Sequence, residues 1–169
     1  EQSLVELKAR VKNLNLFRKR LAELEAERVG CFRQTDTYFE VPKGRLKLRQ
    51  IDGDKKAQLI YYEREDVAKP KKSEVFIIDI GDSESFKTML EKVLRVKATV
   101  NKVREIYRHK GTQIHLDNVK GLGTFIEFER KTPTDLTSVM KNREVLERLM
   151  KTLGIEPESL ESLSYSELV

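Results

Sequence analysis

The sequence predicts an α+β protein built on one large antiparallel sheet. About eight segments alternate apolar and polar residues as strands do, most of them follow one another across short turns, and three amphipathic helices lie between them. A sheet of eight strands can close into a barrel whose interior holds one small ligand. The length of 169 residues, of which 38% are hydrophobic, fits one domain over residues 1–169 with a real core.

Two different periodicities indicate the first strand and the first helix. Apolar and charged residues alternate from Val5 to Val11, which is typical of a strand with one polar face. From about Asn15 to Arg28, apolar residues recur at spacings of three and four, which predicts a helix. Asn15 is available as its N-cap, and Gly30 follows its end.

A series of strands separated by turns follows this helix. Turn-forming segments rich in Gly, Pro, Asp or Lys occur at 42–44, 52–54 and 68–70. They predict hairpin connections between the neighbouring strands. The predicted strands span about Arg33–Glu40, Arg45–Ile51, Ala57–Arg64 and Glu74–Ile80.

The second half of the chain repeats the alternation of helix and strands. Asp82 or Ser83 can cap a second helix, and a third helix runs from about Thr134 to Leu153 and ends at Gly154. The strands expected between them are Ala98–His109, Thr112–Asp117 and Thr124–Arg130. The apolar stripes expected to face the core are Phe86, Met89, Leu90, Val93 and Leu94 on the second helix and Leu136, Val139, Met140, Leu146, Leu149 and Met150 on the third.

Composition excludes several classes of protein. The single cysteine, Cys31, cannot form an internal disulfide, and one Cys with two His residues cannot assemble a structural zinc site, so we expect Cys31 to be buried and inert. The longest apolar run, 75–78, is far shorter than the roughly 20 residues that span a bilayer. No signal peptide is recognisable, so we expect a soluble, cytoplasmic protein with no membrane partner.

The polar faces of the strands are charged, and the two signs are sorted by strand. A single basic strand is usually a solvated face, but this sorting over five strands is harder to explain by solvation alone. If the faces converge inside a barrel, they form a cavity suited to a polyphosphate with a divalent metal, because Lys and Arg bind phosphoryl oxygens and carboxylates bind Mg²⁺ or Mn²⁺. His115 is interpreted as a strand-face residue with a local hydrogen bond. The sorted residues are Arg45, Lys47, Arg49, Lys102 and Arg104 among the cations and Asp117, Glu127 and Glu129 among the anions, with Glu6, Lys8 and Arg10 mixed on the first strand.

The residues that carry these charges resemble the CYTH superfamily of triphosphate tunnel metalloenzymes. The opening Glu-x-Glu-x-Lys of that family corresponds to Leu4–Lys8, where Glu6 and Lys8 match and Leu4 stands in place of the first Glu. The end of the chain resembles the Tyr-Ser-Asp-Leu ending of the cyclase-like branch. Similar motifs follow in order at Asp36–Phe39, Gly44–Arg49, Lys102–Arg104, His115–Glu129 and Tyr165–Leu168.

The resemblance implies a closed, eight-stranded antiparallel tunnel with a role for each charged residue. Because Leu4 replaces a Glu of the family, one carboxylate is missing from the metal-binding side. Tyr62 stands where the family has a Lys, and Arg64 on the same strand face would supply the missing cation. The implied ligands of Mg²⁺ or Mn²⁺ are Glu6, Asp117, Glu127 and Glu129, and the implied triphosphate-binding residues are Lys8, Lys47, Arg49, Lys102 and Arg104, with Arg64.

The resemblance favours an enzyme like the class IV adenylyl cyclases, which convert ATP to cyclic AMP and pyrophosphate. The alternative is a triphosphatase for thiamine triphosphate or inorganic tripolyphosphate, in which Lys8 orients or activates the attacking water. A further alternative is a non-catalytic binder of polyphosphate or RNA, but the basic strand Arg45–Arg49 lacks aromatic residues for stacking on bases. The expected partner is therefore a small-molecule triphosphate rather than nucleic acid, with a homodimer as one possible assembly.

Overall fold

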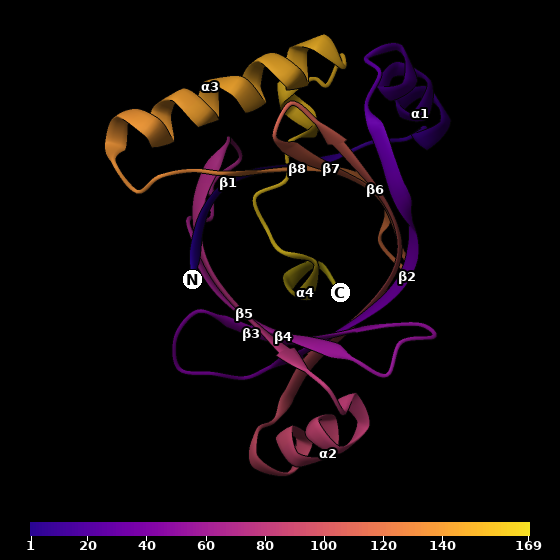
Figure 1. The fold of residues 1–169 in the computed structure, drawn as a ribbon, viewed down its shortest axis with the longest axis vertical. Coiled ribbons are helices and arrows are strands. Elements are labelled where there is room, and N and C mark those ends of the chain that lie inside the picture. The colour runs from indigo at the N-terminus through magenta and orange to yellow at the C-terminus, as the bar shows by residue number, and fades with distance from the viewer.

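The computed structural model describes residues 1–169 and shows eight antiparallel strands that close into a barrel (Figure 1). The strand order around the barrel is β1-β5-β4-β3-β2-β6-β7-β8. This architecture confirms the α+β barrel expected from the sequence. The strands are β1 (Gln2–Arg10), β2 (Glu27–Phe39), β3 (Arg45–Ile51), β4 (Ala57–Arg64), β5 (Lys71–Ile80), β6 (Val96–His109), β7 (Thr112–Val119) and β8 (Gly123–Lys131).

Two hairpin series build most of the barrel. Strands β2 to β5 pair in sequence, and so do β6 to β8, because the turns between them are short. The β6–β7 turn consists of Lys110 and Gly111, both with positive φ, as a two-residue hairpin turn requires. The long β2–β6 pair joins the two series on one side, and β1 closes the barrel between β5 and β8 on the other.

The helices are distributed over the outside and the inside of the barrel (Figure 1). Helices α1 (Leu14–Glu23) and α3 (Leu136–Thr152) lie along one side, and α2 (Ser83–Val93) lies on the opposite side. A short 3-10 turn, Pro157–Ser159, leads into α4 (Tyr165–Leu168), which sits within the ring of strands. None of these helices has both the length and the apolar composition needed to span a bilayer.

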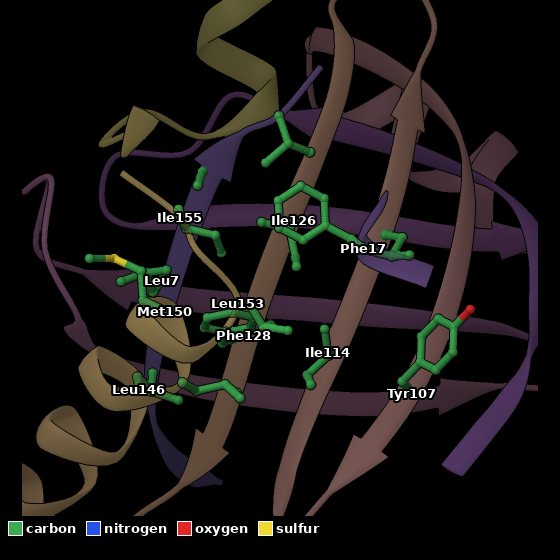
Figure 2. Close-up of a cluster of buried hydrophobic side chains, with 14 of the residues drawn as sticks. Leu7, Phe17, Tyr107, Ile114, Ile126, Phe128, Leu146, Met150, Leu153 and Ile155 are labelled. Carbon is green, nitrogen blue, oxygen red and sulfur yellow. The ribbon is translucent and has the colours of Figure 1, made fainter. Parts of the chain in front are cut away.

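The main hydrophobic core lies outside the barrel, between its wall and the helices α1 and α3. Figure 2 shows Leu7 of β1 and Phe128 of β8 near Leu146 of α3 and near Leu153, which follows α3. Phe17 of α1 joins the same cluster. Since one face of each of these strands is buried against helices, the alternating residues on the other face point into the barrel.

The first helix is shorter than the sequence suggests. The N-cap is Asn13 rather than Asn15, because the Asn13 side chain accepts a hydrogen bond from the Leu16 amide. The helix ends at Glu23 rather than at Arg28. The residues from Glu27 onward belong to β2 instead, because they pair with β6, the neighbouring strand in the barrel wall. A non-local pairing therefore overrides the helical periodicity of this segment.

Three groups of residues are more exposed than expected. The expectation that Cys31 is buried is wrong, because Cys31 is exposed and lies on the part of β2 that extends beyond β3 and pairs with β6 alone. The expected core positions Met89 and Val93 of α2 are exposed, and so are Leu136 and Met140 of α3. On both helices, the stripe of buried residues is narrower than the stripe of apolar residues. Helix α2 packs mainly through Leu90, and α3 packs through Val139, Leu146, Leu149 and Met150.

The contrast within α3 predicts two different mutational outcomes. Leu146→Ala removes a fully buried side chain and should lower the free energy of unfolding by about 3 kcal/mol, because the core retains a cavity. Leu136→Ala, at a position 72% exposed on the same helix, should change it by less than about 0.5 kcal/mol. Urea denaturation followed by circular dichroism measures both. Equal effects would contradict the packing described for α3.

Candidate active site within the tunnel

The interior of the barrel holds a cavity of about 570 Å³ lined by residues from all eight strands and from the C-terminal segment. This volume is within the range of sites for small organic ligands. Its lining contains eight cationic side chains and three carboxylates, so positive charge prevails. The cations are Lys8, Lys47, Arg49, Arg64, Lys102, Arg104, Arg108 and Lys131, and the carboxylates are Glu6, Glu127 and Glu129.

The wall of the tunnel divides into three arcs according to its strands. Cations dominate the inner face of β3 and β6, and acidic residues with His115 dominate that of β7 and β8. Apolar side chains occupy the inner face of β4 and β5 and the start of β1. The strands that differ in charge in the sequence therefore line different sides of one cavity.

A fully buried carboxylate, Asp36 of β2, organises the cationic arc. Arg49 donates to it through two nitrogens at 2.9 and 2.8 Å, and the Nζ atoms of Lys102 and Lys47 lie 2.7 and 3.3 Å away. Burial by itself would raise the pKa of the Asp36 carboxyl, but Arg49, Lys102 and Lys47 hold that pKa well below its usual range. In the sequence, Asp36 stands out only as part of the motif Asp36–Phe39. The signal that could have identified its role is a carboxylate in the middle of a strand that neighbours the basic strand Arg45–Ile51.

The tunnel lysines are poorly solvated. Burial lowers the pKa of Lys47 to about 8 and, against the opposing effect of Asp36, that of Lys102 to about 7. Burial also lowers the pKa of Lys8 to about 8. Its Nζ donates to the Leu163 carbonyl at 2.6 Å and lies 4.2 Å from the ring centroid of Tyr165. An anion that enters the tunnel would therefore meet cations that lack most of their water.

A second buried carboxylate, Asp117 of β7, supports Arg104. Arg104 donates to Asp117 at 2.8 and 2.7 Å and to Glu127 at 3.1 Å. The hydroxyl of Tyr165 also donates to Asp117, at 2.8 Å. Asp117 has no exposed surface and is absent from the cavity lining, although one nitrogen of Arg104, Nη2, contacts both Asp117 and Glu127.

The side chains best placed to hold a divalent metal are His115, Glu127 and Glu129. One ligand atom from each lies within 4.8 Å of the other two. His115 contacts Gln113 at 2.7 Å and Glu127 at 3.3 Å. Two carboxylates suit Mg²⁺ or Mn²⁺, and the imidazole favours Mn²⁺ because Mg²⁺ takes oxygen ligands. His115 does make the expected local hydrogen bond, but our sequence reasoning did not place it in this group.

Glu6 forms an ion pair with Arg64 and is not one of the three clustered side chains. Glu6 faces Glu129 in the β1–β8 register, yet Arg64 of β4 donates to Glu6 at 2.8 Å. Of the four predicted metal ligands, Glu127 and Glu129 lie together with His115, Glu6 pairs with Arg64, and Asp117 shares Arg104 with Glu127. All six predicted triphosphate-binding cations, including Arg64, line the same cavity.

The C-terminal segment forms part of the site. Ser164 and Tyr165 line the cavity, and α4 lies within the ring of strands (Figure 1). Glu167 accepts a hydrogen bond from Arg45 at 2.8 Å and, through its other oxygen, one from the Ser164 amide. The segment is thus anchored inside the barrel by its own polar residues.

The comparison with protein families finds a match over most of the chain. A family model described as "CYTH domain" matches residues 3–165. A curated protein from Methanocaldococcus jannaschii, named "putative adenylate cyclase", is 27% identical over 174 residues, which cover 97% of this chain and 97% of that protein.

Solved structures share the fold. A "putative adenylate cyclase" from Vibrio parahaemolyticus has a TM-score of 0.85 and 27% identity, with 99% of this chain and 97% of that chain covered. A more distant structure, described as a "putative adenylyl cyclase" from Hippeastrum that "reveals a dominant triphosphatase activity", has a TM-score of 0.66 and 17% identity over 99% of this chain and 93% of that one. At that identity, the second likeness concerns the fold alone.

The position of Asp36 among three cations predicts a strong structural effect. Asp36→Asn should lower the free energy of unfolding by about 3 kcal/mol, because it leaves buried cations without their counter-charge. Asp79→Asn, at an exposed carboxylate on β5, is the matched control and should have little effect. Chemical denaturation of both variants measures the difference. Equal stability of the two variants would refute the role given to Asp36.

The lowered lysine pKa values predict a stability that rises with pH. Because the pKa values of Lys47 and Lys102 are lower in the folded protein than the ordinary 10.5, the unfolded chain binds more protons between about pH 7 and about pH 10. The melting temperature should therefore rise from about pH 7 to about pH 9. Lys47→Met should flatten this rise. A melting temperature that falls over this range in the parent protein would contradict the assignment.

Proposed function

The chain belongs to the CYTH domain family, and from this membership we propose that it is a metal-dependent enzyme acting on a triphosphate substrate inside the tunnel. The observation that carries the proposal is the convergence of buried cations and a carboxylate–imidazole group on one cavity. A cavity with eight cations and three carboxylates is suited to a ligand with several negative charges. A merely solvated basic face would leave these side chains outside the barrel.

The chain's own residues would bind the phosphoryl groups from several sides. Lys47, Arg49 and Lys102 reach the cavity from one side, each held in place by Asp36. Arg104 is held in the same way by Asp117, and Arg64 by Glu6. Fixed cations in a poorly hydrated site stabilise the charge that develops on phosphoryl oxygens without reorganising during the reaction.

A divalent cation fits the donor set of His115, Glu127 and Glu129. When bound, the cation would neutralise phosphate charge and polarise a phosphorus–oxygen bond. Glu127 would bind the metal as a carboxylate anion. Burial alone would raise its pKa, but Arg104, His115 and Lys8 hold that pKa well below its usual range. Mg²⁺ and Mn²⁺ are the metals that we propose.

The reaction that we propose is that of a class IV adenylyl cyclase. In it, the ribose 3′-hydroxyl attacks the α-phosphorus of ATP and forms a new P–O bond, its proton passes to water, and pyrophosphate leaves with the electrons of the broken P–O bond. The cationic arc would hold the leaving pyrophosphate, and the enclosed wall would limit competition by water. The names of the M. jannaschii and V. parahaemolyticus proteins support this choice over other reactions on a triphosphate.

A triphosphatase is the second candidate, and the position of Lys8 favours it. Lys8 lies opposite Glu127 in the β1–β8 register, and burial lowers its pKa to about 8, so that it can exchange a proton near neutral pH. It could then orient a water molecule toward the terminal phosphorus of thiamine triphosphate or tripolyphosphate. The triphosphatase activity described for the Hippeastrum protein, which shares the fold, is a further reason to test this reaction.

Product analysis decides between these reactions. With ATP and Mn²⁺, we expect cyclic AMP and pyrophosphate, separated by chromatography from ADP and phosphate. Glu129→Gln should lower turnover about 100-fold and raise the Mn²⁺ concentration needed, because an amide binds the metal less well than a carboxylate. Lys47→Ala should mainly raise KM, since it removes a contact to the substrate.

Glu147→Gln, at an exposed position of α3, is the control for Glu129→Gln and should keep full activity. Circular dichroism must show that both variants are folded. Hydrolysis of tripolyphosphate without any cyclic nucleotide would replace the cyclase by the triphosphatase. Full activity of Glu129→Gln at low Mn²⁺ would contradict the proposed metal ligand.

A further inference from the structure

A second cavity, of about 460 Å³, lies outside the barrel. It is formed by the residue that follows α1, the β6–β7 turn, the end of β8 and one face of α3. It meets the tunnel at the β6–β7 turn, since Gly111 lines the tunnel, Lys110 lines this second cavity, and Thr112 lines both. Its basic residues are His109, Lys110, Arg130 and Arg148, and we call it the outer groove. The reaction proposed for the tunnel gives the outer groove no role.

The outer groove carries positive charge that no carboxylate of the protein neutralises. None of the residues that line it is acidic. None of its four basic residues takes part in an ion pair anywhere in the structure. The tunnel is different, because Lys47, Arg49, Lys102 and Arg104 each pair with a buried carboxylate. In a chain with 28 acidic residues, this arrangement leaves the cations of the outer groove available to an anion from outside.

Arg130 of the outer groove is held in place by the protein. It lies on the outer face of β8, which it shares with the core residues Ile126 and Phe128. Its Nε donates to the Asn142 side chain at 2.7 Å, and its Nη1 donates to the Lys110 carbonyl at 2.6 Å. Its third nitrogen, Nη2, donates to no protein atom and is not buried. The guanidinium is therefore fixed on one side and keeps N–H groups for a ligand on the other.

The β6–β7 turn is shaped to receive this guanidinium. Gly111 has a φ of +80°, and a Cβ atom at this position would lie 3.0 Å from Nη1 of Arg130. Thr112 faces Arg130 in the β7–β8 register, and its hydroxyl accepts a hydrogen bond from Arg130 at 3.3 Å. Glycine thus serves both the backbone conformation of the turn and its close contact with the arginine. The turn and Arg130 together form one rigid wall of the outer groove.

Apolar side chains form another part of the groove wall and restrict the kind of anion that fits. They belong to Leu24, Val145 and Leu149, and Leu149 is also part of the main core. An inorganic anion would leave this apolar surface in water, whereas a ligand with a small apolar group would cover it. A phosphate monoester offers roughly two negative charges and three acceptor oxygens, so it suits several cations better than a single carboxylate does.

We propose that the outer groove is a binding site for a phosphate monoester that carries a small apolar group. Arg130 donates to the phosphoryl oxygens from its fixed position, and Lys110 and Arg148 contribute further charge-assisted hydrogen bonds. The apolar group of the ligand lies against the apolar part of the wall. This site lies outside the tunnel, so it takes a second ligand in addition to the triphosphate substrate and does not depend on the proposed function.

Nuclear magnetic resonance of the isotope-labelled protein, titrated with phenyl phosphate, tests this site. The shifts of the backbone amide signals report both where the probe binds and its Kd. We expect saturable shifts at Lys110, Arg148 and Thr152, which line the outer groove and not the tunnel. Binding of the probe inside the tunnel is read separately from Tyr62 and Ser73, which line only the tunnel.

Two variants of the groove should weaken this binding. Lys110→Gln and Arg148→Gln should each raise the Kd measured at Thr152 about tenfold, because each removes a hydrogen bond from a charged group. Both residues are exposed, so the variants should fold. Lys141→Gln is the matched control, since Lys141 is exposed on α3 and does not line the groove. It removes the same charge and should leave the Kd unchanged.

Three outcomes would overturn the proposal. The first is the absence of shifts at Arg148 and Thr152 when phenyl phosphate is added. The second is an equal effect of Lys141→Gln and Lys110→Gln, which would indicate general attraction of anions. The third concerns inorganic phosphate, which should bind in the groove about fivefold more weakly than phenyl phosphate because it covers no apolar surface. Equal affinity of the two would exclude a site for a monoester.

Discussion

Buried ion pairs hold the tunnel cations in place, and the rest of the site depends on them. A cation inside a protein loses its water, and a nearby carboxylate offsets this loss only if the geometry is close. Asp36 and Asp117 meet this requirement with no exposed surface of their own. Because each lies on the wall behind the cations rather than in the cavity, the inner surface keeps its positive charge. The barrel can thus present an anion-binding surface on which Lys47, Arg49, Lys102 and Arg104 are each paired with a buried carboxylate.

Much of the fold follows from local patterns, and much of the site follows from which strands carry charge. Period-2 alternation is strong from Val5 to Val11 because helices cover one face of β1 and the cavity lies on the other. The limits of β2 could not be obtained in this way, since its first residues alternate weakly and are held only by β6. Likewise, no local pattern shows that Glu6 meets Arg64 or that His115 joins Glu127, because these contacts depend on barrel closure and strand register.

The exposed apolar residues of the helices have a related cause. An apolar stripe shows which face of a helix can be buried, but the partner surface decides how much of it is buried. The barrel wall is curved, so a straight helix such as α3 contacts it along a narrow strip. Val139, Leu146 and Leu149 lie in that strip, while Leu136, at the start of the helix, does not.

The position of α4 inside the ring of strands affects the order in which the site can form during folding. Lys8 contacts the Leu163 carbonyl, so the first strand and the C-terminal segment meet in the finished site. These two residues are 155 positions apart in the sequence. The barrel strands can pair with one another before α4 docks, but the cavity acquires its final lining only when α4 is in place. Completion of the site therefore depends on a contact between segments that lie far apart in the sequence, and such contacts form slowly.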